Sequence, residues 1–139
     1  MKQSKKTYLV DTNVLLRYLI GDGAQKAEKA MALMERVEHG SEEVEICSVI
    51  VAEMIWTLEK FYEVPRRDIA QKLLVIFSFK GVKGTERPII VAALQSYGST
   101  NIDFVDCYLA ARGKGQHMPV YSFDKKDFSR LDIPWEMPQ

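Results

Sequence analysis

The chain has 139 residues, 47% of them hydrophobic and 27% charged, which is the profile of an ordinary globular domain. Its 19 basic and 19 acidic side chains give a formal net charge of zero, which excludes a strongly basic nucleic-acid coat but allows a local basic groove. No apolar run approaches the roughly 18 residues of a membrane span, and none of signal-peptide length follows the N-terminal lysines. Cys47 and Cys107 lie in apolar runs, which is typical of buried thiols in a reducing compartment. We therefore expect one cytoplasmic domain over residues 1–139.

The first predicted strand runs from Tyr8 to Val10 and ends at Asp11. A short, continuous apolar run before a capping residue is typical of a buried inner strand in a parallel sheet. Helical spacing then predicts a helix that carries Val14, Leu15, Tyr18 and Leu19 and is ended by Gly21 and Gly23. A second helix over residues 24–38 and a strand over 44–47 complete this half.

The second half is mainly helical. The expected elements are helices over 48–62 and 65–79, a short strand near 81–84, a helix over 88–97, a helix from Asn101 or Asp103 to Ala111 ended by Gly113 and Gly115, a strand over 119–123, a helical turn after Asp124 and an edge strand near Trp135. Strands that alternate with helices indicate an α/β fold: a three-layer α/β/α sandwich with a mostly parallel sheet of four to five strands.

Two acidic residues stand at predicted strand ends. Asp11 directly follows the first strand, and Asp124 follows the strand over 119–123. Each could simply cap the helix after it, a role that aspartate fills well. However, ligands of open α/β sheets bind at the carboxyl ends of the strands, so both are also candidate site residues. Asp127, three residues beyond Asp124, could share its role.

Two more acidic residues lie near predicted helix starts. Glu53 is the only charged residue between Ile46 and Leu58, and Asp106 lies three residues after Asp103 in another apolar segment. The helix dipole alone could favour these positions, and Glu53 could lie on a minor exposed face. Helix capping fully explains an aspartate at position 103. It explains Asp106 less well, because the apolar residues around it leave only a narrow face of the helix exposed to solvent.

Strand ends and the following helix starts share one edge of a parallel sheet, so these four carboxylates could converge. Two carboxylates 4 Å apart repel by roughly 4 kcal/mol at an effective dielectric near 20. Four of them therefore need cations, and hard, oxygen-preferring Mg²⁺ or Mn²⁺ fits best. No Cys/His spacing in the chain suggests zinc.

The four acidic segments, in this order, resemble the PIN-domain family, and within it the VapC ribonuclease toxins of toxin–antitoxin pairs. The matching segments are residues 8–16 (YLVDTNVLL), 48–53 (SVIVAE), 103–111 (DFVDCYLAA) and 120–124 (VYSFD) with Phe128 after it. The chain departs from the family pattern where Cys107 and the bulky Tyr108 follow the third acid, and where both Asp124 and Asp127 are available as the fourth.

The resemblance implies a divalent-metal-dependent endoribonuclease that hydrolyses phosphodiester bonds of single-stranded RNA. Its catalytic and metal-binding residues would be Asp11, Glu53, Asp106 and Asp124, with Mg²⁺ or Mn²⁺ as the cofactor. Asn13, Asp103, Ser122 and Asp127 would be auxiliary residues. The resemblance also implies a homodimer and an antitoxin partner, and no membrane.

Basic residues beside the acidic segments could bind the RNA backbone, although each could equally be an ordinary surface charge. They are Arg17, Arg112, Lys114, Lys125 and Lys126.

Two alternatives remain open. One is a PIN-like module that binds RNA or protein without cleaving, although retention of all four acids argues against it. The other is a haloacid-dehalogenase-like phosphatase, whose second aspartate is here Asn13 and whose downstream lysine has no convincing match.

Overall fold

The structure is a computed structural model that describes residues 6–21 and 24–139. Gly23, one of the two expected helix stops, lies outside the described residues, as do the first N-terminal lysines. The elements in chain order are β1 (Thr7–Leu9), α1 (Thr12–Ile20), α2 (Ala24–His39), β2 (Glu43–Glu45), α3 (Ser48–Lys60), α4 (Arg66–Phe77), β3 (Val82–Lys83), α5 (Arg87–Ser99), α6 (Phe104–Gln116), β4 (Val120–Tyr121), α7 (Lys125–Phe128) and β5 (Trp135–Glu136).

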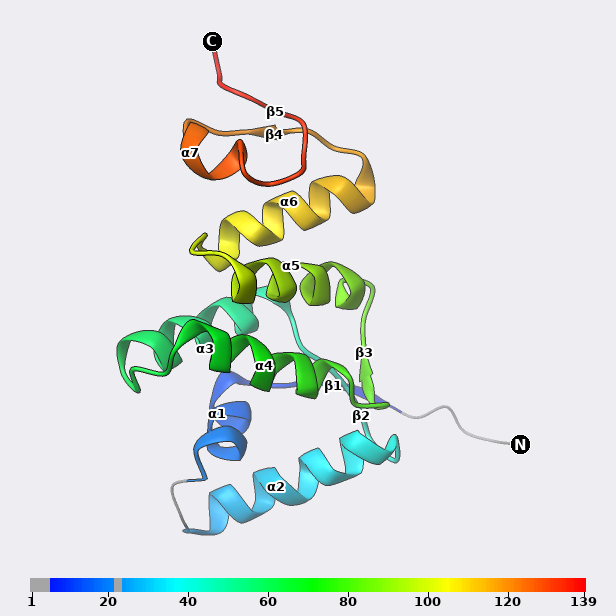
Figure 1. Cartoon of the computed structure of the whole chain (residues 1–139). Coiled ribbons are helices and arrows are strands. Elements are labelled where there is room, and N and C mark those ends of the chain that lie inside the picture. The colour runs from blue at the N-terminus through cyan, green and yellow to red at the C-terminus, as the bar shows by residue number, and fades with distance from the viewer. Residues whose placement is uncertain (1–5, 22–23) are drawn as a thin grey trace, which may run out of the picture.

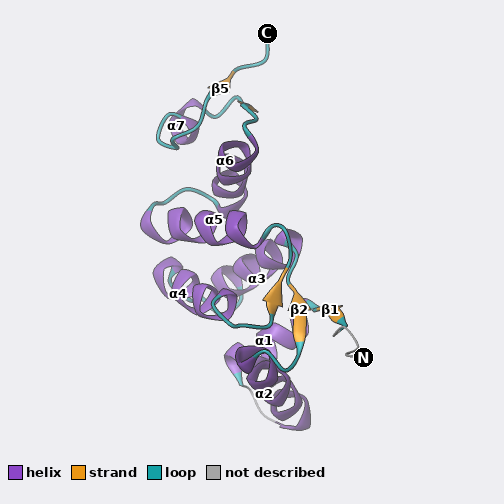
Figure 2. Ribbon diagram, turned by 90° about the vertical axis from the view of Figure 1, so that its right-hand side faces the viewer, coloured by secondary structure: helices purple, strands orange, loops and turns teal. Residues whose placement is uncertain are grey.

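Three of the strands form a parallel sheet in the order β1-β2-β3, with Tyr8 opposite Val44 and Val44 opposite Val82. Helices α1 and α2 lie on one side of this sheet, and α3 and α4 lie on the other (Figures 1 and 2). The prediction of an α/β fold with helices on both sides of a parallel sheet is thus confirmed.

The remaining elements extend away from this sandwich. Helix α5 packs against α4 on one side and against α6 on the other. Beyond α6, β4 and β5 pair in parallel as a separate two-stranded sheet beside α7, at the end of the molecule farthest from α2 (Figures 1 and 2). The expected four to five strands are therefore present but are divided between two sheets, because α5 and α6 lie between β4 and β1.

The first strand differs from its predicted environment. Its apolar run predicts a buried inner strand, but β1 is the edge of its sheet and Thr7, Tyr8 and Leu9 are all exposed. Leu9 is 74% exposed, while Val10, the next residue, is buried. The reason is strand order: no strand among the described residues pairs with the outer edge of β1.

Helix α6 is longer than predicted and runs through Gly113 and Gly115 to Gln116. A Cβ at Gly113 would lie 2.5 Å from the carbonyl oxygen of Met118 and 2.9 Å from Cδ1 of Ile133. This glycine therefore permits close approach of the C-terminal segment rather than ending the helix. His117, in the left-handed conformation with φ 56°, caps α6 instead. In α1, by contrast, Gly21 is the left-handed cap that the sequence predicts, with φ 63°.

A half-buried polar network fixes how α4, α5 and the turn before α6 meet. The guanidinium of Arg66 donates to the carbonyl oxygens of Tyr97, at 3.1 Å, and of Ile102. It also lies 4.0 Å from the ring centroid of Tyr97 and 3.8 Å from a carboxylate oxygen of Glu59. The Tyr97 hydroxyl donates to the same carboxylate. Burial and this carboxylate raise the pKa of Tyr97.

The apolar core is one cluster of buried side chains that includes Leu15, Val44, Leu73, Leu94 and Phe128. Both cysteines are free thiols, Cys47 half-buried and Cys107 buried. Among the described helices, none has the length and apolarity that crossing a membrane requires.

Candidate metal site

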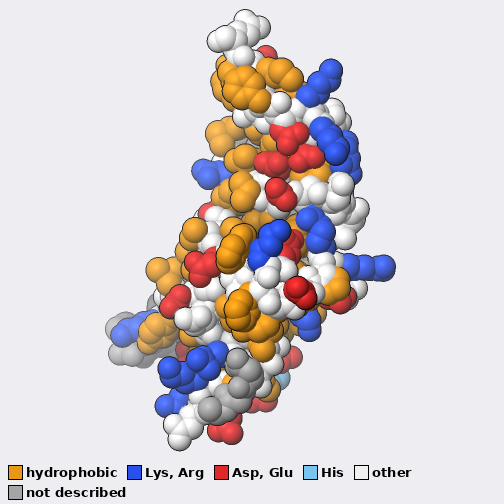
Figure 3. All heavy atoms as spheres, turned by 90° about the vertical axis from the view of Figure 1, so that its left-hand side faces the viewer, with side chains coloured by type: hydrophobic (Ala, Val, Ile, Leu, Met, Phe, Trp, Pro, Cys, Tyr) orange, Lys and Arg blue, Asp and Glu red, His pale blue; other side chains and the backbone are white. Residues whose placement is uncertain are grey.

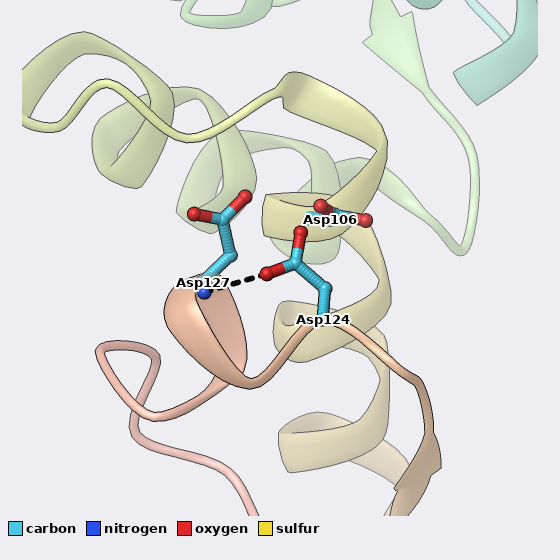
Figure 4. Close-up of side chains that lie close together, drawn as sticks. All are labelled: Asp106, Asp124 and Asp127. Carbon is cyan, nitrogen blue, oxygen red and sulfur yellow. Dashed lines mark hydrogen bonds between the residues drawn. The ribbon is translucent and has the colours of Figure 1, made fainter. Parts of the chain in front are cut away.

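Three aspartates form the one group of potential metal ligands among the described residues. They are Asp106, Asp124 and Asp127, and each offers a carboxylate oxygen within 4.8 Å of those of the other two. Asp106 comes from α6, whereas Asp124 and Asp127 come from the short α7 segment that faces it (Figure 4). The structure thus joins the third and fourth acidic segments of the sequence.

The local backbone explains how α7 presents its two carboxylates. Asp124 is the N-cap of α7, and its Oδ1 accepts a hydrogen bond of 2.9 Å from the backbone N–H of Asp127 (Figure 4). The hydroxyl oxygen of Ser122 accepts a bond of 2.9 Å from the N–H of Asp124. Phe128 is buried and packs on Trp135, with ring centroids 6.4 Å apart, which anchors the turn.

The three carboxylates carry more negative charge than their surroundings balance. Partial burial raises the pKa of Asp106, and the nearby carboxylates of Asp124, Asp127 and Asp103 raise it further. A hydrogen bond with the side chain of Asp127 acts in the same direction. Grouped carboxylates that repel one another are the ligand set that hard divalent cations prefer, so these residues fit Mg²⁺ or Mn²⁺.

The first two acidic segments lie elsewhere. Asp11 is exposed at the N-cap of α1, where its Oδ1 accepts a bond of 2.7 Å from the N–H of Thr12. Glu53 is exposed on α3, and neither residue belongs to the aspartate group. One chain in this conformation therefore joins three of the predicted site residues and separates them from Asp11 and Glu53.

The predicted auxiliary residues have different environments. Asp127 is a full member of the aspartate group, and Ser122 fixes the backbone of Asp124. Asp103 is the N-cap residue of α6 but makes no side-chain capping bond, and it acts on Asp106 through its charge. Asn13 is exposed on α1, next to the first acidic segment.

Two features near the site were not predicted from the sequence. Thr12, beside Asp11, is 3% exposed, and its hydroxyl finds no hydrogen-bond partner among the residues that the structure describes. On α6, the Tyr108 hydroxyl donates to Glu86 and accepts a bond of 3.4 Å from Arg112. Glu86 stands in the irregular segment before α5, where no periodic pattern could mark it as a partner.

Basic side chains lie near the aspartate group in the sequence. Lys125 and Lys126 belong to α7 itself, and Arg112 and Lys114 are exposed on α6. Lys114 lies 3.4 Å from Asp132 in an exposed ion pair, which is expected to contribute little to stability. Figure 3 shows acidic side chains gathered on the upper part of one face, with Lys and Arg side chains and hydrophobic side chains beside them.

Comparison with known proteins identifies the family of this chain. The PIN domain family matches residues 8–134, which is nearly the whole chain. The chain is also similar to a VapC ribonuclease from Aquifex aeolicus (strain VF5), with 27% identity over 124 residues that cover 88% of this chain and 90% of the relative. The match over residues 8–134 shows that the chain belongs to the PIN domain family.

Proposed function

We propose that this protein is a divalent-metal-dependent endoribonuclease that hydrolyses phosphodiester bonds of single-stranded RNA, as the toxin of a VapBC-type toxin–antitoxin pair. The observation that carries the proposal is the group formed by Asp106, Asp124 and Asp127 on a PIN framework. The similarity to a VapC ribonuclease supports the choice of RNA as substrate and of an antitoxin as partner.

In this proposal Asp106 and Asp124 hold Mg²⁺ or Mn²⁺, Asp127 assists them, and Asp11 and Glu53 complete the site. Such a cation, when bound, supplies Lewis-acid chemistry that activates water and stabilises charge on the phosphate. Ser122 holds the backbone of Asp124 in place. Asn13, two residues after Asp11, would orient the carboxylate of Asp11. Glu53 is exposed and so is open to position the attacking water.

Positive charge beside the carboxylates would hold the RNA backbone. Lys125 and Lys126 are exposed on the same short helix as Asp127, and among the described residues neither forms an ion pair. A second set of basic residues follows Asp11 in the sequence. A groove of about 350 Å³ between α1 and α2 is lined by Asn13 and by Arg17, Lys26 and Lys29. Binding that neutralises phosphates with these groups weakens steeply as salt rises.

We also propose that the protein acts as a homodimer in the cytoplasm, where its RNA substrate is found, and that an antitoxin restrains it. The groove between α1 and α2 is lined by the apolar side chains of Val14, Ala30 and Leu33 as well as by Asn13 and the three basic residues. An antitoxin segment with apolar and acidic side chains would suit this surface.

The test is cleavage of a mixed single-stranded RNA pool by purified protein with Mg²⁺, with Mn²⁺ and with a chelator. Asp106→Asn keeps the shape of the side chain but removes its charge, and Asp132→Asn makes the same change at an exposed position outside the group. We expect metal-dependent cutting by wild type and Asp132→Asn, and loss of cutting with retained RNA binding in Asp106→Asn. RNA binding without cutting by wild type in either metal would instead indicate a non-catalytic binding module.

A further inference from the structure

Exposed apolar side chains flank the proposed site residues on both halves of the chain. Around Asp11 and Glu53, the exposed fractions are 55% for Tyr8, 74% for Leu9, 70% for Val49 and 63% for Trp56. Val49, Glu53 and Trp56 lie three or four residues apart and therefore share one face of α3. A soluble protein rarely leaves such a set uncovered, so this surface is a candidate interface.

Exposed apolar side chains also lie near the site residues of the C-terminal half of the chain. Around Asp106 and Asp124, the exposed fractions are 54% for Val105, 40% for Leu109, 73% for Tyr121 and 77% for Phe123. The two apolar surfaces thus each surround part of one proposed site.

Two free strand edges accompany these surfaces. The outer edge of β1 has no partner among the described strands, and β4 pairs only with β5. Parallel sheets are normally covered and two-stranded sheets are marginal by themselves, so both edges favour another strand. A groove of about 410 Å³ lined by Tyr8, Leu9, Val10 and Leu33 follows β1 to Asp11, and it has room for an aromatic side chain from an added strand.

The strand ends specify how β1 and β4 would pair. Asp11 follows the carboxyl end of β1, and Asp124 follows that of β4. Only a parallel pairing brings these two ends to the same edge. That pairing would also bring the apolar surfaces together.

The chain's own β4 is held away from β1. Helices α5 and α6 lie between the two strands, as both views show (Figures 1 and 2). Arg66 ties the turn between α5 and α6 to α4 through the carbonyl oxygens of Tyr97 and Ile102. Pairing within one chain would require this packing to open, whereas β4 of a second copy could reach β1 without breaking it.

We therefore propose that two copies of this chain exchange their C-terminal segments, so that β4 of each copy adds in parallel to β1 of the other. Each nuclease site then takes Asp11 and Glu53 from one copy and Asp106, Asp124 and Asp127 from the other. The exchange is reciprocal, as a two-fold dimer requires. The composite site rests on the proposed function, while the exchange itself is testable without it.

Crosslinking tests the exchange independently of activity. Leu9→Cys and Tyr121→Cys are combined in one chain with Cys47→Ser, and a short bismaleimide is added. Cys107 is retained, because burial raises the pKa of its thiol to about 11 and keeps it unreactive. We expect a dimer-sized product on a denaturing gel, absent from each single variant. A monomer-sized product with the two cysteines linked would overturn the proposal in favour of pairing within one chain, and no link between them would overturn it as well.

Subunit mixing tests the composite site. Asp11→Asn and Asp106→Asn chains are unfolded together, refolded and assayed on the RNA pool. Half of the random dimers are mixed and each of these has one intact site, so we expect about one quarter of wild-type activity. The matched control mixes Asp11→Asn with Glu53→Gln; both changes fall in the same half, so every site is damaged. No recovery in the first mixture, with active wild type and mixed dimers present, would refute composite sites. Inactive wild type with a dimer-sized crosslink would refute the proposed function and leave the exchange supported.

Discussion

The repulsion within the aspartate group predicts that removing one of its charges stabilises the metal-free protein. Two unit charges 4.8 Å apart, the separation that bounds this group, repel by about 3.5 kcal/mol at an effective dielectric near 20 and by about 0.9 kcal/mol in bulk water. Asp124 is exposed, and Asp106 and Asp127 are half-buried, so the true value lies toward the lower end. We expect Asp106→Asn to raise the unfolding free energy by about 1 to 2 kcal/mol, or Tm by roughly 3 to 6 °C.

The same substitution should remove the response to metal. A cation at one hundred times its Kd stabilises the folded protein that binds it by about 2.7 kcal/mol. Wild type should therefore become the more stable of the two proteins in Mn²⁺, while the unfolding free energy of Asp106→Asn should be the same with and without the metal.

The assay is urea unfolding followed by circular dichroism, with chelator and with Mn²⁺, for wild type, Asp106→Asn and the exposed control Asp132→Asn. The control should match wild type in both conditions. A metal-free Asp106→Asn protein no more stable than wild type, or one that gains as much from Mn²⁺ as wild type does, would refute the reasoning.

Three further substitutions test the frame that holds the site. Arg66→Met should cost about 3 kcal/mol, because it removes the guanidinium donor from two carbonyl oxygens and the positive charge beside the carboxylate of Glu59; the urea midpoint measures this, and a cost below about 1 kcal/mol would contradict it. Tyr97 has a raised pKa in the folded state, so its stabilising contribution is complete below its ordinary value of 10.0 and declines above it; Tyr97→Phe should flatten the loss of stability above about pH 10, and an equally steep loss there would be the contrary result. Gly98→Ala should destabilise by about 1 kcal/mol or more, because its Cβ would lie 2.6 Å from that of Ala70; calorimetry should show a lower Tm, and an unchanged Tm would mean that α4 and α5 separate easily.

Local chemistry explains which parts of the fold were predictable from the sequence. Short apolar runs predicted the strands, and the side-chain caps at Asp11 and Asp124 mark the helices that follow them. The left-handed cap at Gly21 follows from its freedom at positive φ. In each of these cases the deciding interaction lies within a few residues of the position concerned.

The features that could not be predicted depend on contacts between distant segments. Gly113 reads as a helix stop, but the approach of Met118 and Ile133 decides its role. The exposed environment of Leu9 depends on strand order, which no local pattern contains. In the site, the sequence placed Asp106, Asp124 and Asp127 among the candidates, and the fold of α7 against α6 brings all three together. Joining Asp11 and Glu53 to that group stays a prediction.

The most extensive helix contacts join elements that follow one another along the chain: α1 with α2, α4 with α5, and α5 with α6. Such neighbouring units can begin to fold while the chain is still being made. The N-terminal sandwich would leave the ribosome first, and β4 with β5 would emerge last. A neighbouring nascent chain on the same messenger RNA would then already display its β1 edge, at a local concentration far above that of released protein. Dimer assembly would thereby be coupled to the rate at which one message is translated.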